Sequence, residues 1–456
     1  MTLNAEKWDF PGWPDCVEFE RAQLEEKRQL QEGLLIKAIK RAWDNIPMFR
    51  RKCEAAGVRA EIRASSDIGK LPLLFKDDLR LSLKEYHPFG DYVGNYQIMR
   101  LQSTTGSTGK PTPMLFTRRD WDVIANLMSR RFNQAGVKKG DIVQVSLTYS
   151  LYIAAFDFTE GAQNIGAMVI PAGSGAVTSS QRQIEIARDW GTTVMVSTPS
   201  YMLHLGDLAA ANGIDPRRDL KVRIALVTAE ALTPEMKLRL ENQWGCQVYD
   251  AYGTGEMPCI ASQCQEFGGM HINDDAYFCE LVDPNTKVSV PEGKEGVLVL
   301  TSLFREATQL VRWYTGDIVR ISSEPCACGR TLTRLVEMKG RSDDCVKVRG
   351  VLFYPATVEA VIGKFPDLGS EFLIEIDKKG NMDTCKVTLE YIEARTGDLT
   401  TLRGQVSEAL WGKLNFKSDV ELVPFGELGK KLGVETRVKS SKKRVLDYRV
   451  PSHRLD

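Results

Sequence analysis

The stretch Ser103-Thr-Thr-Gly-Ser-Thr-Gly-Lys-Pro-Thr112 governs how the rest of this chain is interpreted. Its side chains are short and polar or else charged, so they cannot pack a hydrophobic core. Glycines let backbone N–H groups converge on an anion, hydroxyls add donors, and Lys110 supplies positive charge. The stretch therefore predicts a loop that grips phosphate.

This loop is not a Walker A loop. Gly106 and Gly109 lie too close together, and Pro111 follows Lys110 where a magnesium-binding hydroxyl would stand. For such a run taken alone, a mobile surface turn of glycine, serine and threonine is the alternative interpretation.

Length and charge limit the classes of partner. A chain of 456 residues predicts about two to four domains with a large core. Its 60 basic and 60 acidic residues give a formal net charge of zero, which leaves no electrostatic footprint for nucleic acid or an anionic membrane. We therefore expect a small-molecule partner, no nucleic acid and no membrane.

The N-terminus and the cysteine content predict a soluble, cytoplasmic protein. Residues 1–10 carry charges and no apolar run, so we expect no signal peptide. Asp157 and Glu160 interrupt the best candidate for a membrane span. Clustered cysteines among the ten are then better interpreted as thiols or metal ligands than as disulfides.

The first hundred residues predict packing rather than chemistry. Residues 16–57 show leucines at helical spacing, with Pro47 and Gly57 as punctuation. The charged segment from Lys76 to Lys84 is interpreted as a solvated surface.

Strands and helices are predicted to alternate between residues 120 and 227, which indicates parallel α/β layers. Ligands bind beyond the carboxyl ends of the strands in such sheets. The predicted helices cover 120–134, 181–190 and 201–212, the strands cover 141–147, 167–171, 193–197 and 222–227, and the candidate site loops cover 149–156, 172–175, 198–201 and 228–230.

A predicted strand at 247–249 leads into a glycine-rich turn at 250–256. Glu256 in this turn could hold Mg²⁺ beside phosphates, although an ordinary surface turn is the alternative. Short apolar runs with hairpin punctuation then predict a β-rich subdomain from residue 276. It ends near Asp317, which could accept hydrogen bonds from the hydroxyls of a ribose.

Three cysteines and one histidine form a candidate zinc site. Cys264 and His271 precede the Cys326-Ala-Cys328 pair, and three thiols with one imidazole suit tetrahedral Zn²⁺. Four protein ligands leave no position for a catalytic water, so the site would be structural. Unliganded thiols are the alternative, with Cys259 and Cys279 as competing ligands.

Residues 340–344 predict a domain boundary. Beyond it, a β-α-β-β-α-β rhythm predicts a small α+β domain. We expect strands at 346–348, 371–376, 386–392 and 420–423 and helices at 355–362 and 399–414. The fold class is thus α/β: an N-terminal domain (1–342) of layered α/β subdomains plus a β-rich subdomain, and a C-terminal domain (345–456).

The chain carries, in order, the phosphate loop, the glycine-rich turn at 250–256, Asp317, the boundary at 340–344 and a basic tail. In this order of features it resembles the adenylate-forming superfamily of acyl-CoA synthetases. It is most similar to the phenylacetate–CoA ligase-like branch of aryl-CoA ligases. The resemblance runs from about Leu71 to Asp447. Thr198-Pro199-Ser200-Tyr201 and Ala229-Glu230 are typical of this branch. It implies a small C-terminal lid domain that swings about a hinge near 343–344.

The resemblance also implies roles for individual residues. Cys264, His271, Cys326 and Cys328 match the zinc-binding insert of the branch. Asp317 stands at the position of the acid that binds the ribose, and Arg341 at that of its partner arginine. Glu256 stands at the position of a magnesium ligand. Nucleotide binding is implied for Ser103, Thr104, Thr105, Gly106, Thr108, Gly109, Ala229, Glu230, Asp250, Ala251, Tyr252, Gly253, Thr254, Asp317 and Arg341, and coenzyme A (CoA) binding for Arg349 and Gly350.

The chain departs from the family pattern in two places. Gly255 stands where the family has serine or threonine. In the basic tail, Ser441 stands at the position of the family's catalytic lysine. We expect the neighbouring Lys442 to take that role, with Lys439 as the competing assignment.

The function that follows is an AMP-forming acid–thiol ligase. ATP activates an aromatic carboxylic acid as acyl-AMP with release of pyrophosphate, and CoA then takes the acyl group. Lys110, Glu256 and Lys442 are the expected catalytic residues, and Mg²⁺ is expected at the phosphates. Aromatic walls and small residues predict a flat pocket for the acid. Its expected lining is Tyr149, Tyr152, Phe156, Ala172, Gly173 and Ala229.

Rival functions remain open on the sequence. The acyl group could pass to a carrier protein instead of CoA, or the chain could be a catalytically weakened nucleotide-binding scaffold, as Ser441 suggests. A serine hydrolase is disfavoured, because no histidine stands near a Gly-x-Ser-x-Gly motif. A homodimer is also left open.

Overall fold

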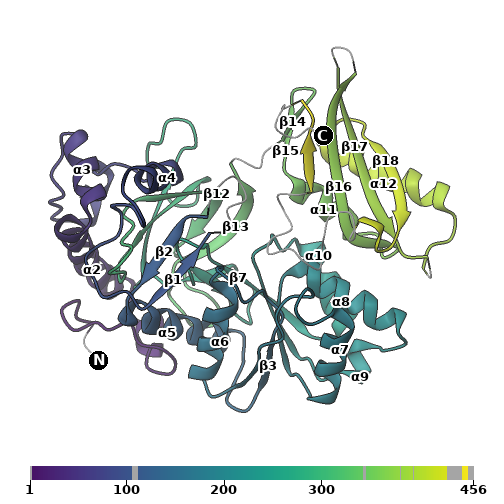
Figure 1. Ribbon diagram of the computed structural model, residues 1–456, viewed down its shortest axis with the longest axis horizontal. Helices are drawn as coiled ribbons and strands as arrows, with labels where there is room; N and C mark the ends of the chain where they lie inside the picture. The colour runs from purple at the N-terminus through teal and green to yellow at the C-terminus, as the bar shows by residue number, and fades with distance from the viewer. Residues whose placement is uncertain are drawn as a thin grey trace. The chain divides into compact units, whose positions relative to one another are not determined.

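The computed structural model of the protein describes residues 3–104, 111–342, 346–379, 382–393, 395–428 and 444–449. The chain forms two compact units from interleaved segments. The first combines residues 1–141, 149–169 and 249–342, and the second combines residues 142–148, 170–248 and 343–456 (Figure 1). The predicted domain boundary at 343–344 lies outside the described residues and stays a prediction.

The first unit begins with helices, as predicted for residues 16–57. Pro47 starts a new helix because its ring is tolerated in a first turn, and the chain also breaks at residues 21–23. Helix α5 begins at Arg118, two residues before its predicted start at 120, and ends at Gln134 as predicted. The helical elements are α1 (Val17–Glu20), α2 (Leu24–Asn45), α3 (Pro47–Ala55), the 3₁₀ turn η1 (Ser65–Lys70), α4 (Lys76–Glu85), α5 (Arg118–Gln134) and α6 (Ala154–Asn164).

An antiparallel sheet forms the β-rich part of the first unit, as predicted. Its strands follow the order β10-β11-β12-β13-β9-β8-β7. A separate antiparallel pair, β1 (Arg100–Ser103) and β2 (Pro113–Phe116), stands apart from it (Figure 1). The sheet strands are β7 (Gln247–Tyr252), β8 (Ala261–Gln263), β9 (Met270–Ile272), β10 (Tyr277–Val282), β11 (Gly296–Ser302), β12 (Trp313–Ser322) and β13 (Arg334–Arg341).

The predicted turn at 250–256 is partly wrong, because strand β7 continues to Tyr252. Ala251 pairs with Ser262 and Tyr252 with Ala261 across the antiparallel ladder with β8. Pairing with β8, the next strand along the chain, therefore extends the element by three residues, and the turn begins at Gly253.

The second unit contains the parallel α/β layer that the sequence predicts. Strands β3 (Ile142–Val145), β5 (Val194–Ser197) and β6 (Ile224–Thr228) pair in parallel, and β4 (Met168–Ile170) follows β3. Helices α8 and α10 lie side by side (Figure 1), and buried Met202, Leu205, Met236 and Leu240 join them in one hydrophobic core. The helices are α7 (Ser180–Asp189), α8 (Pro199–Ala211), α9 (Pro216–Asp219) and α10 (Pro234–Trp244).

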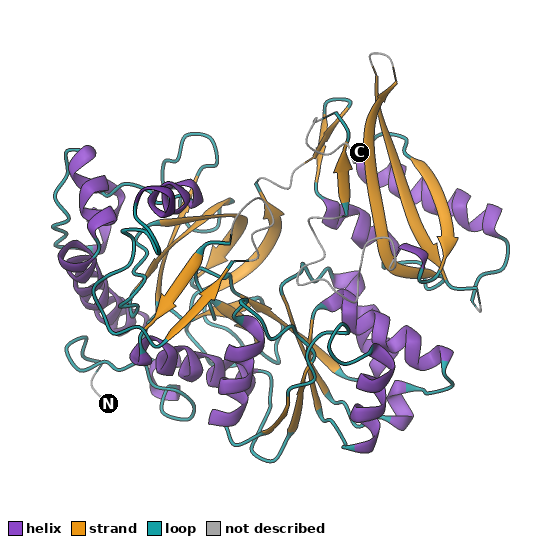
Figure 2. Cartoon of the chain, in the orientation of Figure 1, coloured by secondary structure: helices purple, strands orange, loops and turns teal. Residues whose placement is uncertain are grey.

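Residues 346–449 add a hairpin and a four-stranded sheet in the order β18-β17-β16-β19, with helices α11 and α12 (Figure 2). The sequence missed two strands here: β15, which closes the hairpin, and β19, which pairs in parallel with β16. Arg444, just before β19, is buried and donates to Glu359 and Glu371. The elements are β14 (Val346–Val348), β15 (Val351–Phe353), α11 (Pro355–Ile362), β16 (Leu368–Lys379), β17 (Met382–Tyr391), α12 (Leu399–Leu414), β18 (Asp419–Pro424) and β19 (Val445–Asp447).

Within the described part of the chain, every helix is too short or too polar to serve as a membrane span.

A buried ion pair ties the N-terminal segment to helix α5. The Arg130 guanidinium donates to both carboxylate oxygens of Asp275, at 2.8 and 2.9 Å, and Trp8 Nε1 donates to Asp275 Oδ2 at 3.0 Å. The side chains of Arg130 and Asp275 are 1% and 0% exposed. Removal of one partner would leave the other charge buried and unmatched.

We therefore predict that Asp275→Asn destabilises the protein by about 3–5 kcal/mol, the usual cost of breaking a buried pair from one side. Urea and thermal unfolding measure the effect. Asp122→Asn is the control, because Asp122 forms an exposed pair with Arg118 and should change stability by less than about 1 kcal/mol. Equal midpoints for the two variants would contradict the assignment.

Candidate active site and metal site

The pairing of β1 with β2 holds both ends of the predicted phosphate loop. Ser103 pairs with Pro113, and Thr104 N donates to Thr112 O at 3.1 Å. Thr112 N donates in turn to Thr104 Oγ1 at 3.2 Å, and the Thr112 hydroxyl is buried without a hydrogen-bond partner among the described residues. The hairpin thus brings the two ends of the loop together. Thr105, Gly106, Thr108, Gly109 and Lys110 lie outside the described residues.

The turn after β7 lies against the start of this loop. A Cβ atom at Gly255 would stand 3.3 Å from Thr104 Cγ2 and 3.4 Å from Thr104 Cα. The turn therefore packs closely against Thr104, and a side chain at 255 would need Thr104 to move by a few tenths of an ångström. Thr254 Oγ1 accepts a hydrogen bond from Met257 N at 3.0 Å and closes the turn.

Glu256 ends the turn and is 7% exposed. Its Oε1 lies 3.2 Å from the amine of Lys76, the first residue of α4. The Lys76 side chain itself stays 39% exposed, as expected for the charged segment, and in addition contacts this buried carboxylate. No local pattern indicates this contact, because the two residues are 180 positions apart.

Asp317 and Arg341 face each other across β12 and β13, as the predicted pair requires. Arg341 Nη1 lies 3.6 Å from Asp317 Oδ1 and donates to Thr315 O at 3.0 Å. The Tyr252 hydroxyl donates to Asp317 Oδ2. Residues from β7, β12 and β13 therefore meet at one carboxylate.

Hydrogen bonds within the protein fix the position of Asp250. Its Oδ1 accepts from Ala251 N at 2.8 Å, and its own N–H donates to Gln263 Oε1 at 2.9 Å. Burial raises the pKa of Asp250 to about 7. Gly253 follows the strand, and a side chain there would meet the backbone N of Cys259 at 3.0 Å.

Tyr149, Tyr152 and Phe156, the aromatic residues predicted to line the acid pocket, all belong to the first unit. The Tyr149 and Phe156 rings meet edge to face with centroids 5.2 Å apart, and the Tyr149 hydroxyl lies 2.6 Å from Thr159 Oγ1. Burial raises the pKa of Tyr149. Tyr152 is buried, whereas Phe156 is half-buried and able to contact a ligand.

The remaining predicted pocket residues belong to the second unit. Gly173 takes a left-handed φ of 77° and accepts a hydrogen bond from Gln183 Nε2 at 3.0 Å, and Ala172 is buried beside it. Ala229 also takes a left-handed φ, of 71°, which is rare without glycine and common at functional sites. Glu230 accepts from Ser200 N and Oγ at 3.1 and 2.9 Å.

Arg349 and Gly350 form the two-residue turn of the β14–β15 hairpin. Both have left-handed φ values, 50° and 83°, as such turns require. Arg349 donates to Asp383 through its backbone N and its Nε. The hinge residues 343–344 and the tail residues Lys439, Ser441 and Lys442 lie outside the described residues.

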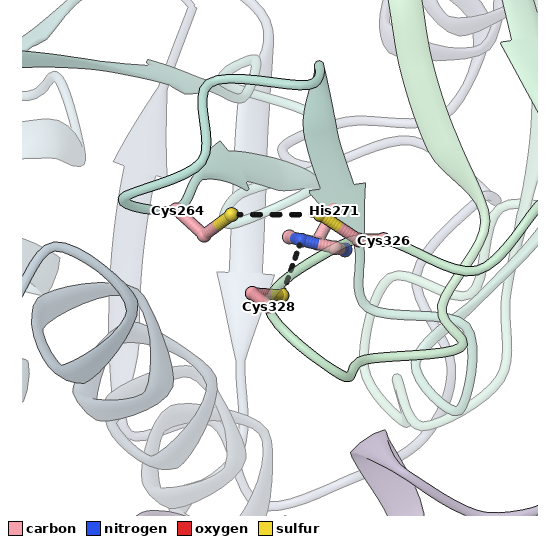
Figure 3. A group of neighbouring side chains, drawn as sticks. All are labelled: Cys264, His271, Cys326 and Cys328. Atoms are coloured by element: carbon pink, nitrogen blue, oxygen red, sulfur yellow. Dashed lines mark hydrogen bonds between the residues drawn. The ribbon is translucent and has the colours of Figure 1, made fainter.

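The predicted zinc ligands come together. The ligand atoms of Cys264, His271, Cys326 and Cys328 all lie within 4.8 Å of one another (Figure 3). Cys264 Sγ is 3.8 Å from Cys326 Sγ, and Cys328 Sγ is 3.4 Å from His271 Nε2. Cys264 follows β8, His271 lies in β9, and the other two occupy the loop between β12 and β13.

The surroundings of the cluster favour a thiolate. Although burial alone would raise it, hydrogen bonds from Arg330 lower the pKa of the Cys328 thiol. Arg330 also donates to the buried carboxylate of Glu20 at 2.6 Å. The competing cysteines do not belong to the cluster: Cys259 contacts Asp157 and Ile124, and Cys279 contacts the Tyr277 carbonyl.

Comparison with known proteins agrees with this architecture. The AMP-binding enzyme family matches residues 70–304, and the AMP-binding enzyme C-terminal domain matches residues 350–449. Phenylacetate-coenzyme A ligase from Aromatoleum evansii is 34% identical over 83% of this chain and 85% of its own. The enzyme of that name from Escherichia coli (strain K12) is 32% identical over 92% of this chain and 96% of its own.

Among solved structures, a 2-hydroxyisobutyryl-CoA ligase in complex with R3-HIB-AMP superposes with a TM-score of 0.87. It is 29% identical and covers 94% of this chain and 91% of its own. The chain belongs to the AMP-binding enzyme family. Within that family it is an ATP-dependent acid–thiol ligase, which forms an acyl-AMP and transfers the acyl group to CoA.

Proposed function

We propose that this ligase acts on an aromatic carboxylic acid of the phenylacetate class. The observation that carries the proposal is the edge-to-face pair of Tyr149 and Phe156, with Phe156 half-buried. Such a pair offers an apolar, aromatic surface to an aromatic ring. The phenylacetate-coenzyme A ligases among the relatives support the same class of acid.

In the first half-reaction, a carboxylate oxygen of the acid attacks the α-phosphorus of ATP, and pyrophosphate leaves. Phosphoryl transfer depends on positioning and on charge neutralisation rather than on covalent catalysis by the protein. We assign the phosphates to the loop that begins at Ser103 and Thr104. Lys110 and Lys442 keep their expected roles as cations near the phosphates.

Glu256 fits a magnesium site. It is a buried carboxylate beside the loop, and its Lys76 partner has a side chain 39% exposed. The Lys76 amine therefore neutralises the charge of Glu256, and because the Lys76 side chain is partly exposed, a metal ion from solvent can take its place. Bound Mg²⁺ would neutralise phosphate charge at this position.

Asp317 and Tyr252 would hold the ribose. Asp317 Oδ2 accepts a hydrogen bond from the Tyr252 hydroxyl, and Arg341 lies close to Asp317 Oδ1. A carboxylate fixed in this way can still accept hydrogen bonds from ribose hydroxyls, since each oxygen has two lone pairs. Asp250, Ala251, Gly253 and Thr254 would form the wall beside the base.

In the second half-reaction, the CoA sulfur attacks the carbonyl carbon of the acyl-AMP, and AMP leaves with its oxygen. The exposed turn at Arg349 and Gly350 is the part of the small domain that we assign to CoA. Transfer to the thiol of a carrier protein is the alternative route, and the acyl-AMP is common to both.

We further infer that Cys264, His271, Cys326 and Cys328 hold structural Zn²⁺. Zinc–sulfur bonds of about 2.3 Å at tetrahedral angles place two sulfurs about 3.8 Å apart, which fits the 3.8 Å between Cys264 and Cys326. When bound, the ion would fasten the loop between β12 and β13 to β8 and β9.

Replacement of Glu256 tests the magnesium assignment. We predict that Glu256→Gln lowers the rate of pyrophosphate release by at least about 10-fold at every Mg²⁺ concentration, because even outer partners of a metal site are worth that much. Glu337→Gln is the matched control, since Glu337 pairs with Arg320 on the surface. A wild-type rate in Glu256→Gln would refute the role.

Removal of a zinc ligand tests the metal site. Cys326→Ser should lose bound zinc, measured by elemental analysis, and lower the melting temperature by more than about 4 °C, a shift that reflects about 1 kcal/mol or more. Its turnover at low temperature should fall less. Cys279→Ser should keep its zinc, and a wild-type zinc content in Cys326→Ser would overturn the assignment.

A substrate panel tests the acid. The purified protein with ATP, Mg²⁺ and CoA should release pyrophosphate with phenylacetate or benzoate-type acids at a kcat/KM more than about 10-fold above that with 2-hydroxyisobutyrate. The reverse order would favour a small branched hydroxy acid. Pyrophosphate release without CoA consumption would favour the carrier route, and no release with any acid would favour a scaffold.

A further inference from the structure

Arg100, the first residue of β1, lies between two aromatic rings. Its Cζ is 4.0 Å from the ring centroid of Trp121 in α5 and 4.6 Å from that of Phe156 in α6. Both distances are well inside the range of about 6 Å in which a cation is attracted to a ring face. One guanidinium therefore bridges two helices and the strand that leads into the phosphate loop.

The rings are the main partners of this guanidinium. Arg100 Nη1 is buried without a hydrogen-bond partner among the described residues. Burial lowers the pKa of Arg100, and the nearby carboxylate of Glu160 opposes this. An arginine nevertheless stays charged in a protein. A partly desolvated cation with few hydrogen bonds interacts strongly with a ring face.

Strand β1 touches the segment 149–156 at a second point. Ser103, three residues after Arg100, donates its backbone N–H to Leu151 O at 2.7 Å. Leu151 stands between Tyr149 and Phe156 in the chain. The strand that starts the phosphate loop is thus fixed to the aromatic segment by a backbone hydrogen bond at one end and by the Arg100 side chain at the other.

We propose that Arg100 is a positioning residue that sets the orientation of Phe156, and thereby the affinity and selectivity for the aromatic acid. Phe156 is held by the cation and by the Tyr149 ring, so its rotation would disturb both contacts. The proposal rests on the proposed acid site and adds a residue that is not among the predicted pocket residues.

The link through Ser103 adds a consequence. Because Arg100 and Ser103 belong to one short strand, the phosphate loop and the aromatic wall share a support. Strand β1 stays paired with β2, so replacement of Arg100 should change the aromatic wall more than the start of the loop.

The test compares the KM values of Arg100→Met for acid and for ATP in pyrophosphate release. We expect the KM for the aromatic acid to rise about 10-fold, equivalent to about 1.4 kcal/mol. The KM for ATP should change less than about 2-fold. Arg100→Lys should recover part of the acid affinity, because it keeps the charge over one ring.

Two further variants separate positioning from general damage. Phe156→Leu should raise the acid KM to a similar extent, and Arg100→Met added to it should cause little further change, since both act through one ring. Arg119→Met is the control, because Arg119 stacks on Phe10 at 5.5 Å elsewhere in the same unit. It should leave the acid KM unchanged.

The outcomes are distinct. An unchanged acid KM in Arg100→Met, an equal rise in both KM values, or additive effects with Phe156→Leu would each overturn the proposal. If Arg100→Met does not fold, Arg100→Lys and Phe156→Leu decide it by the same KM comparison. Failure of the wild-type protein to activate any aromatic acid would instead overturn the proposed function.

Discussion

The antiparallel pairing of β1 with β2 is the constraint on which the active site depends. A loop of short polar residues has no core of its own, so its ends must be fixed by something else. Backbone hydrogen bonds between Thr104 and Thr112 do this, and the close approach of Gly255 to Thr104 sets the next turn against the loop. Glu256 follows directly, so the same pairing places the carboxylate assigned to magnesium.

Two kinds of buried ion pair differ in how easily they can be opened. Arg130 with Asp275, and Arg312 with Glu280, are matched by partners that are themselves buried, and such pairs hold distant segments together. Glu256 differs, because its partner Lys76 is reachable from solvent. A buried acid balanced by an exchangeable cation suits a ligand that arrives with its own metal ion, whereas a closed pair does not.

The metal cluster and the nucleotide strand are neighbours in one sheet. Cys264 follows β8, whose Ser262 pairs with Ala251 of β7, and Gln263 accepts from the backbone of Asp250. A closed four-ligand site at the end of β8 would therefore stiffen the strand beside the nucleotide without contact to substrate. In the proposed arrangement, a structural ion would support the enzyme without taking part in its chemistry.

The sequence by itself determined the elements whose signals are local. Helix α11 begins at Pro355, and α12 ends just before Asn415, which has a left-handed backbone conformation. Both helices were predicted with their observed bounds, because the hydrophobic periodicity agrees with the residues that start and end helices. The four zinc-ligand candidates were also identified, since thiols and imidazole are recognisable by chemistry alone.

Only the tertiary structure decided the features that depend on distant partners. The strand β19, the contact of Lys76 with Glu256 and the place of Arg100 between two rings each join separate segments of the chain. The extension of β7 to Tyr252 depends on its pairing with β8. No periodicity or capping pattern records such pairs, because their free energy arises only when the fold has brought the partners together.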